Sequence, residues 1–226
     1  MDSSELSVGI SVQAAGFDNT YAVGSYQGIK PSFGWMRGRF GAAATVGLYH
    51  LTENGRAVYG LGDVMAAGHA TVVVSETLDA GAALHVMVPT GGETDVFGMG
   101  HVMAMPSLWG TWRAHAFTIM ASGGYGRAVT SQSGAHQDHG TLPLVDPMNL
   151  QELTWSAGAD LEIGHGVRVG GRTLGGIPIG MGHTRASGGG RVAWATSRVS
   201  TTFELQCGVV GDPFTMRGVV ETSLRF

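Results

Sequence analysis

Apolar and polar residues alternate with a period of two along most of the chain. In the stretch 152–163, leucine, tryptophan and alanine share one face, while threonine, serine, glycine and carboxylates share the other. Successive side chains of a β-strand point to opposite faces, so this pattern predicts a strand with one apolar and one polar side. Three carboxylates on the polar side, Glu152, Asp160 and Glu162, favour a barrel wall with lipid outside and a polar lumen inside.

The same alternation recurs about twelve times. It predicts strands at 4–15, 25–37, 40–51, 61–75, 79–90, 99–111, 113–125, 151–162, 166–178, 190–198, 200–210 and 216–226. Short connections are expected near 38–39, 76–78, 112, 163–165 and 199, and longer ones at 16–24, 52–60, 91–98, 126–150, 179–189 and 211–215. Short periplasmic turns, long external loops and an even strand number are typical of outer-membrane barrels, with both termini in the periplasm.

Composition supports the same fold class. No stretch approaches the roughly 18 apolar residues of a membrane helix, only 13% of residues are charged, and 38 of 226 are glycine, which disfavours long helices. Only helices and closed barrels satisfy all backbone polar groups inside lipid. We therefore predict an all-β protein, an antiparallel up-and-down transmembrane β-barrel of about 12 strands. It is expected to form a single domain over 1–226, located in the bacterial outer membrane; a soluble β-sandwich is the competing interpretation.

The C-terminal segment adds a separate signal. Val220, Leu224 and the terminal Phe226 share one face, which resembles the closing strand of bacterial outer-membrane proteins. That resemblance implies the outer-membrane assembly machinery as a partner during biogenesis. No signal peptide is recognisable, so we expect Met1 to stand at the start of a mature sequence.

Several function classes are disfavoured. The net charge of −4 without a basic run argues against nucleic acid as a partner. Cys207 is the single cysteine, which excludes an internal disulfide. No nucleophile elbow, P-loop or zinc-protease motif occurs, so we expect neither an enzyme nor an organic cofactor.

Histidine and methionine gather on the expected lumen side of three strands. The residues concerned are His69, His85, His101, Met87, Met103 and Met105. Thioether and imidazole groups suit soft ions such as Cu(I) or Ag(I), and weak sites suit passage. The other interpretation is that methionine fills a narrow lumen and histidine is an ordinary polar lining residue.

Charged residues of both signs are also expected to face the lumen. They are Lys30, Asp63, Glu152, Asp160, Glu162, Arg168, Arg172, Glu204 and Glu221. No sign dominates, so strong ion selectivity is not implied. Arg168 and Arg172 are expected to pair with carboxylates of the preceding strand. In the long loop, His136, Asp138 and His139 form either an external divalent-metal site or a solvated polar stretch.

Three short glycine-rich motifs occur in order around two of the expected strands. They are Gly60-Leu61-Gly62-Asp63, Val88-Pro89-Thr90-Gly91-Gly92 and Gly98-Met99-Gly100. Over about 50 residues this order resembles the family of outer-membrane transport proteins linked to aromatic-degradation (phenol meta-pathway) clusters. The resemblance implies a barrel that lets a small solute cross the outer membrane.

Three functional hypotheses remain open. The first is a channel or transporter, with the lipid bilayer and a small solute as partners. The second is a copper or silver conduit lined by the histidines and methionines. The third is a plugged structural barrel that anchors or joins an envelope complex.

Overall fold

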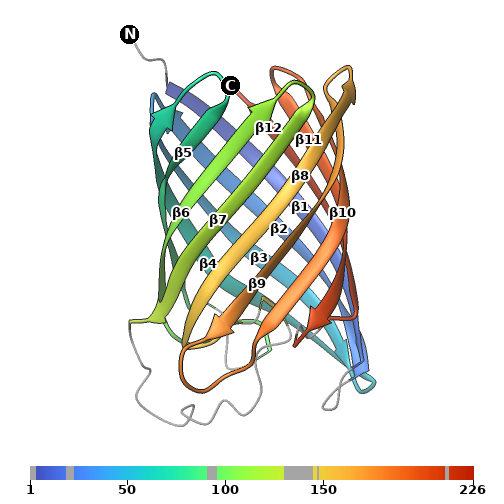
Figure 1. The fold of residues 1–226 in the computed structure, drawn as a ribbon. Helices are drawn as coiled ribbons and strands as arrows, with labels where there is room; N and C mark the ends of the chain where they lie inside the picture. Colours follow the sequence, from blue (N-terminus) through green and yellow to red (C-terminus); the bar gives the residue numbers. More distant parts are fainter. Residues whose placement is uncertain (1–3, 19–22, 91–95, 130–144, 147, 212–213) are drawn as a thin grey trace.

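The computed structural model describes residues 4–18, 23–90, 96–129, 145–146, 148–211 and 214–226, and shows a closed antiparallel β-barrel (Figure 1). Its strands are β1 (Ser4–Asp18), β2 (Val23–Arg37), β3 (Phe40–Glu53), β4 (Arg56–Val74), β5 (Leu78–Val88), β6 (Met103–Ala114), β7 (Phe117–Ala128), β8 (Gln151–Gly164), β9 (Val167–Pro178), β10 (Arg185–Ala195), β11 (Val199–Val210) and β12 (Met216–Arg225). The predicted twelve-strand architecture is confirmed. Within these residues, no helix is long and apolar enough to cross a membrane.

The outer face of the wall is apolar, as the alternation predicts. On β1, Leu6, Val8, Ile10 and Val12 keep 43–47% of their surface exposed on the outside. The intervening residues towards the end of the strand, such as Phe17, are buried inside the barrel. Exposed apolar side chains of this kind recur around the barrel, and burying them in lipid is favourable. The barrel therefore spans a membrane with its strands.

The last strand closes the barrel against the first. Val8 lies opposite Leu224 and Val12 opposite Val220, so apolar residues of both strands share the outer face. The backbone of Phe226 donates to Leu6 at 2.9 Å, which fixes the terminal residue in the ladder. The ends of β1 and β12 that carry the chain termini lie at the same end of the barrel as the short turns (Figure 1).

Several of the expected boundaries are wrong: the tenth strand begins at Arg185 instead of 190, and the turn expected at 112 lies after Ala114, so that the seventh strand begins at Phe117 instead of 113. The expected loop at 52–60 is a tight turn at Asn54 and Gly55, whose φ angles of 47° and 80° are those of a primed hairpin turn. Because Glu53 already faces Arg56 across this turn, β4 runs for 19 residues. The sixth strand begins at Met103 instead of 99, which leaves the residues before it outside the wall.

We expect a charge on the lipid face to destabilise the barrel far more than one in the lumen. Leu108, at the middle of β6, is 70% exposed on the outside, and its neighbour Ser107 points inward. Leu108→Arg should lower the free energy of unfolding by about 2–4 kcal/mol, because the cation then lies in hydrocarbon. The measurement is denaturant unfolding in lipid vesicles, with Ser107→Arg as the control. Equal effects of the two variants would contradict the assigned faces.

Candidate functional site

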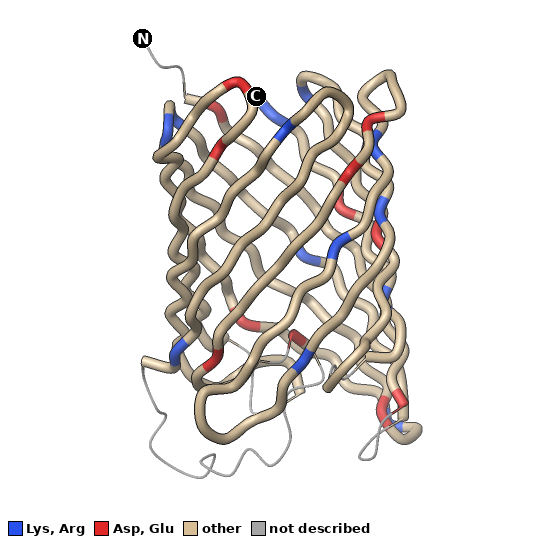
Figure 2. The backbone as a smooth tube through the Cα atoms, viewed as in Figure 1, with Lys and Arg blue, Asp and Glu red and all other residues tan. Residues whose placement is uncertain are grey.

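The lumen has two unlike walls. Strands β5, β6 and β7 carry charge only near their ends, at Asp79, Arg113 and Arg127. Strands β8 to β12 carry charged residues along their length, as Figure 2 shows for the backbone positions. One side of the lumen is therefore neutral and the other strongly polar.

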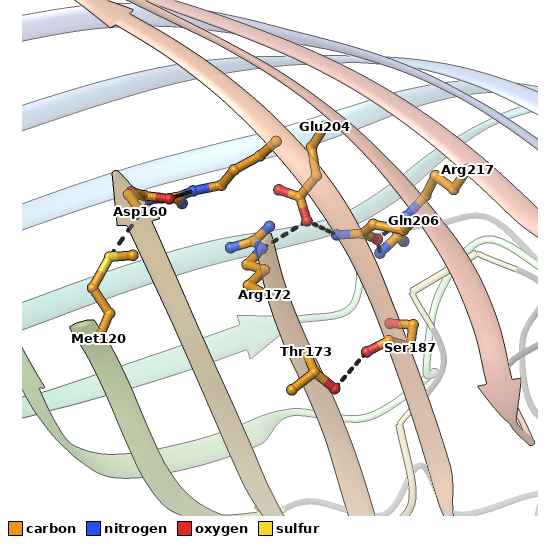
Figure 3. A network of polar contacts seen from close by, with 9 residues as sticks. Met120, Asp160, Arg172, Thr173, Ser187, Glu204, Gln206 and Arg217 are labelled. Carbon is orange, nitrogen blue, oxygen red and sulfur yellow. Dashed lines mark hydrogen bonds and ion pairs between the residues drawn. The ribbon is translucent and has the colours of Figure 1, made fainter. Parts of the chain in front are cut away.

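Ion pairs on the polar wall reach across an intervening strand (Figure 3). Asp160 of β8 accepts a hydrogen bond from Arg191 Nε of β10 at 2.8 Å. Gly170 of β9 lies between the two, and a side chain there would collide with the carboxylate of Asp160. Such bridges hold alternate strands together from inside the lumen.

The partner of Arg172 differs from the one expected from the sequence. Arg172 lies opposite Gly158 of β8, which has no side chain to bind. Its Nε donates instead to Glu204 of β11 at 2.8 Å. Arg168 does lie opposite a carboxylate of β8, that of Glu162. The sequence could not supply the partner of Arg172, because a barrel lets side chains reach beyond the adjacent strand.

The end of the barrel opposite the short turns is called the loop end. A chain of polar contacts continues from Glu204 towards it (Figure 3). Gln206 donates to Glu204 and accepts from Arg217 Nε, with an N–O distance of 2.9 Å for the second contact. Arg217 also lies 3.8 Å from Asp146 Oδ1. The polar wall is thus linked to the connection between β7 and β8.

Two segments outside the strands fold into the loop end. The first comprises residues 96–102 and precedes β6; the second comprises 145–146 and 148–150 and precedes β8. Val145 of the second donates its N–H to the carbonyl of Val96 in the first at 3.2 Å. Val145 is only 1% exposed and Phe97 only 2%. We call these two the inward segments.

The inward segments complete an apolar core inside the loop end, which we call the aromatic cluster. Its members are Ala15, Phe17, Tyr26, Tyr49, Leu51, Phe97, Val145 and Phe214. Phe97 stacks on Tyr49 with ring centroids 6.1 Å apart. Gly60 and Gly62 make room for this pair, because a Cβ at either position would overlap one of the rings.

A second group, the methionine cluster, packs nearby. It consists of Met87, Met99, Met103 and Met148, with Met105 partly buried against it. Met99 and Met148 come from the two inward segments, whereas Met87 and Met103 come from β5 and β6. The methionines therefore help to seal both segments to the neutral wall.

A small cavity touches both clusters. It has about 40 Å³ of room and is lined by Tyr49 and Phe97 of the aromatic cluster and by Met87 of the methionine cluster. Lys30, Asp63 and Asp146 also line it. This space suits a few water molecules, each of which needs roughly 10–15 Å³ by this measure. The cavity itself has no room for a larger solute.

Asp146 pins the second inward segment at this cavity. Its carboxylate pairs with Lys30, accepts a hydrogen bond from Tyr49 Oη at 3.1 Å and lies near Arg217. Burial inside the loop end opposes its ionisation, but the charges of Lys30 and Arg217 outweigh that effect, so the pKa of Asp146 lies below its usual value. Asp146 is therefore charged at neutral pH. We call its contacts with Lys30, Tyr49 and Arg217 the Asp146 clamp.

A second anchor holds the same segment. Asn149 donates to Glu152 through its backbone N–H at 3.1 Å and its side chain at 2.8 Å. Asn149 also exchanges hydrogen bonds with the backbone of His183, while Glu152 pairs with Arg185 Nη2 at 2.5 Å. Glu152 is fully buried. The segment is thus fixed at both ends of its described part.

The residues expected to bind soft metal lie on the wall of the barrel, except for His101. The register brings Met87 opposite Met103, at the methionine cluster. His85 lies opposite Met105, and His69 lies further towards the turns, opposite Ala83. His101 is buried in the first inward segment. The His85–Met105 pair therefore lies next to the Met87–Met103 pair on the lumen face, whereas His69 lies further along the wall and His101 lies outside it.

The remaining expected residues take no part in the loop-end contacts or lie beyond the described part. Glu221 lies opposite Ser11, and both Glu221 and Glu162 are exposed in the lumen. His136, Asp138 and His139 lie outside the described residues. Within the described residues, no group of three or more His, Cys, Asp or Glu side chains is placed to hold a metal ion.

Sequence reasoning missed Asp146, Asn149, Tyr49 and Phe97 as residues of the loop end. The one available signal was the length of the connection 126–150, because connections of that length without regular structure are often functional. Nothing in its pattern indicated that it folds inward.

The chain matches no protein-family model and no curated protein by sequence. Solved structures share its fold. The COG4313 outer membrane channel from Pseudomonas putida F1 aligns over 100% of this chain and 96% of its own, with a TM-score of 0.76 and 10% identity. The KdgM porin aligns over 97% and 99%, with a TM-score of 0.58 and 8% identity.

A third similar structure is the translocator domain of the autotransporter NalP from Neisseria meningitidis. It aligns over 99% of this chain and 88% of its own, with a TM-score of 0.57 and 12% identity. At these identities the likeness shows the fold of outer-membrane barrels. Channels and a translocator domain share that fold, so the function has to be inferred from the lumen.

We expect Glu152 to be the most important single carboxylate for stability at the loop end. Glu152→Ala leaves Arg185 buried without its partner and removes the anchor of Asn149, so the free energy of unfolding should fall by about 3 kcal/mol. Glu162→Ala, at an exposed lumen position on the same strand, should cost less than about 1 kcal/mol. Denaturant titration in detergent compares the two, and similar losses would show that the Glu152 contacts contribute little.

Proposed function

We propose that the chain is an outer-membrane channel for a small solute, closed at its outer mouth by the inward segments and opened by their displacement. The observation that carries this proposal is the Asp146 clamp. It places a charged loop residue inside the barrel, on Lys30 and Arg217, beside a water-sized cavity. Ion pairs, hydrogen bonds and the packing of the two clusters hold this closure, and none of them is part of the backbone ladder of the wall, so the closure can be released without disturbing that ladder.

The two walls of the lumen favour a solute with one apolar and one polar side. Such a solute would contact the neutral side chains of β5 to β7 on one side and the polar ladder of β8 to β12 on the other. The motif resemblance to transport proteins of aromatic-degradation clusters points to the same class, small aromatic compounds. The similarity in fold to outer-membrane channels supports passage of small solutes in general.

A plugged structural barrel is the second candidate, and the two packed clusters inside the loop end favour it. The two candidates differ in one measurable respect. Loosening the inward segments of a channel increases conductance, whereas a structural plug leaves the bilayer insulating until the barrel unfolds. The fold gives no support to an enzyme, since the similar structures with the highest TM-scores are channels and a translocator domain.

Asp146→Asn tests the channel proposal. The amide cannot neutralise Lys30 and Arg217, which then repel each other at the cavity. We expect a larger open fraction or conductance in planar bilayers than for the wild type at neutral pH. Asp18→Asn, at the exposed outer end of β1, is the matched control and should behave as wild type. An insulating Asp146→Asn barrel that is correctly folded would favour the structural plug.

The clamp also predicts a pH dependence. Because the pKa of Asp146 is lowered in the folded barrel, the clamp is fully formed above the usual aspartate value of about 3.9 and is lost only as the pH falls below it. Conductance should stay constant from neutral pH to about 5 and rise below about 4. The rise should be absent in Asp146→Asn. A rise of the same size in that variant would assign it to other carboxylates.

A further inference from the structure

We propose that the methionine cluster, together with Met65 beside it, binds one soft monovalent cation, Ag(I) or Cu(I), with Asp63 as the counter-charge. This site goes beyond the proposed channel function, because binding does not require passage. It also differs from the row expected from the sequence, since His69 and His85 take no part.

Methionine side chains from five segments of the chain lie close together: Met87, Met99, Met103 and Met148 pack in the methionine cluster, and Met65 lines the adjacent cavity beside Met87. Met65 of β4 lies opposite Met87 of β5, which lies opposite Met103 of β6, so three thioethers form a row across adjacent strands. Met99 and Met148 add two more from the inward segments. Met103 is completely buried, and Met87, Met99 and Met148 are less than 10% exposed.

The space above Gly126 of β7 shows how closely these side chains converge. A Cβ at that position would lie 3.5 Å from the Cε atoms of both Met103 and Met148, and 3.4 Å from Cγ of Met105. Each sulfur is one bond away from the atom measured. Three thioethers therefore surround a point that the missing side chain of Gly126 leaves open.

The chemistry of these ligands selects the ion. Thioether sulfur is a soft, neutral ligand that favours Cu(I) and discriminates against hard cations, which prefer oxygen. Methionine has three rotatable side-chain bonds, so small rotations can direct several sulfur atoms to one ion. A site built of neutral ligands still needs a counter-charge, because burying an isolated cation is costly.

Asp63 meets that requirement. Its Oδ2 accepts the backbone N–H of Met99 at 2.8 Å, which ties the carboxylate to the methionine cluster. Its Oδ1 is buried and makes no hydrogen bond of regular geometry to the described residues, although the backbone N–H of Thr90 also interacts with this carboxylate. Asp63, Met65 and Met87 line the same cavity. Lys30 and Arg217 are directed to Asp146 instead, so a bound cation would satisfy the open oxygen of Asp63.

Packing alone explains only part of this arrangement. Leucine would fill a buried apolar site as well as methionine and with less conformational freedom to lose. Packing also gives no reason for a carboxylate with an open oxygen beside the sulfur row, since an unsatisfied buried acceptor costs free energy. Water in the cavity satisfies the carboxylate oxygen but gives no reason for the sulfur row, whereas a soft cation accounts for both features.

Calorimetric titration of the folded protein in detergent with silver nitrate, in chloride-free buffer, tests the proposal. The exposed thiol of Cys207 would bind silver by itself, so all variants carry Cys207→Ala. We expect one saturable site. Met65→Leu, Met87→Leu and Met103→Leu together should weaken binding by more than about tenfold, the lower end of the effect of losing even an outer-shell partner.

Two further variants make the test specific. The matched control replaces three exposed methionines outside the cluster, as Met36→Leu, Met181→Leu and Met216→Leu, and should bind silver as the parent does. Asp63→Asn should weaken binding by about tenfold while leaving the sulfur row in place.

Each possible result of the silver titrations has a different consequence for the site. No saturable silver binding in the parent, or equal binding by the cluster variant and the control, would overturn the site. Loss with the cluster variant but none with Asp63→Asn would overturn the role of the carboxylate. Silver binding is read in detergent without any conductance, so failure of this site leaves the channel proposal standing, and the reverse also holds.

Discussion

A sheet that crosses a membrane cannot leave an edge strand unpaired, because lipid offers no hydrogen-bond partners to its backbone. The pairing of β1 with β12 removes both edges and fixes the barrel as a closed cylinder. Closure directs every second side chain into a shared lumen and the others, most of them apolar, towards the lipid. That lumen has to be filled, bridged or left to water, and the three solutions occur together in this chain.

Glycine residues determine where large side chains fit inside the lumen. At Gly60 and Gly62 it admits the stacked rings of Tyr49 and Phe97, which help to fill the loop end. At Gly170 it lets Asp160 reach Arg191 two strands away. At Gly126 it opens the space on which three methionines converge. The high glycine content is thus a means of fitting large functional side chains into a narrow cylinder.

The strands and their faces could be predicted because a period of two is a local property of the sequence. The Asn54–Gly55 turn could also have been predicted, since Asn-Gly is a strong hairpin signal. The prediction of a long loop at 52–60 did not take this signal into account. The closure of the loop end could not be predicted from the sequence. Asp146 meets Lys30 across 116 positions of the chain, and Val145 meets Val96 between two irregular segments. Such contacts depend on the complete barrel.

For the same reason, the sequence could place methionines on the lumen side but could not tell which of them meet. The register separates His69 from the Met87–Met103 pair, and the inward segments supply Met99 and Met148. Arg172 is a parallel case, because its partner on β11 depends on the glycine opposite it on β8.

The inward segments either close a channel, as we propose, or plug a structural barrel. Single-channel recording of the unaltered protein in planar bilayers at neutral pH distinguishes the two. We expect small, infrequent openings, because the Asp146 clamp and the two packed clusters hold the inward segments inside the loop end. A steady conductance as large as that of an open porin would contradict the closure, and a permanently insulating barrel would contradict the channel.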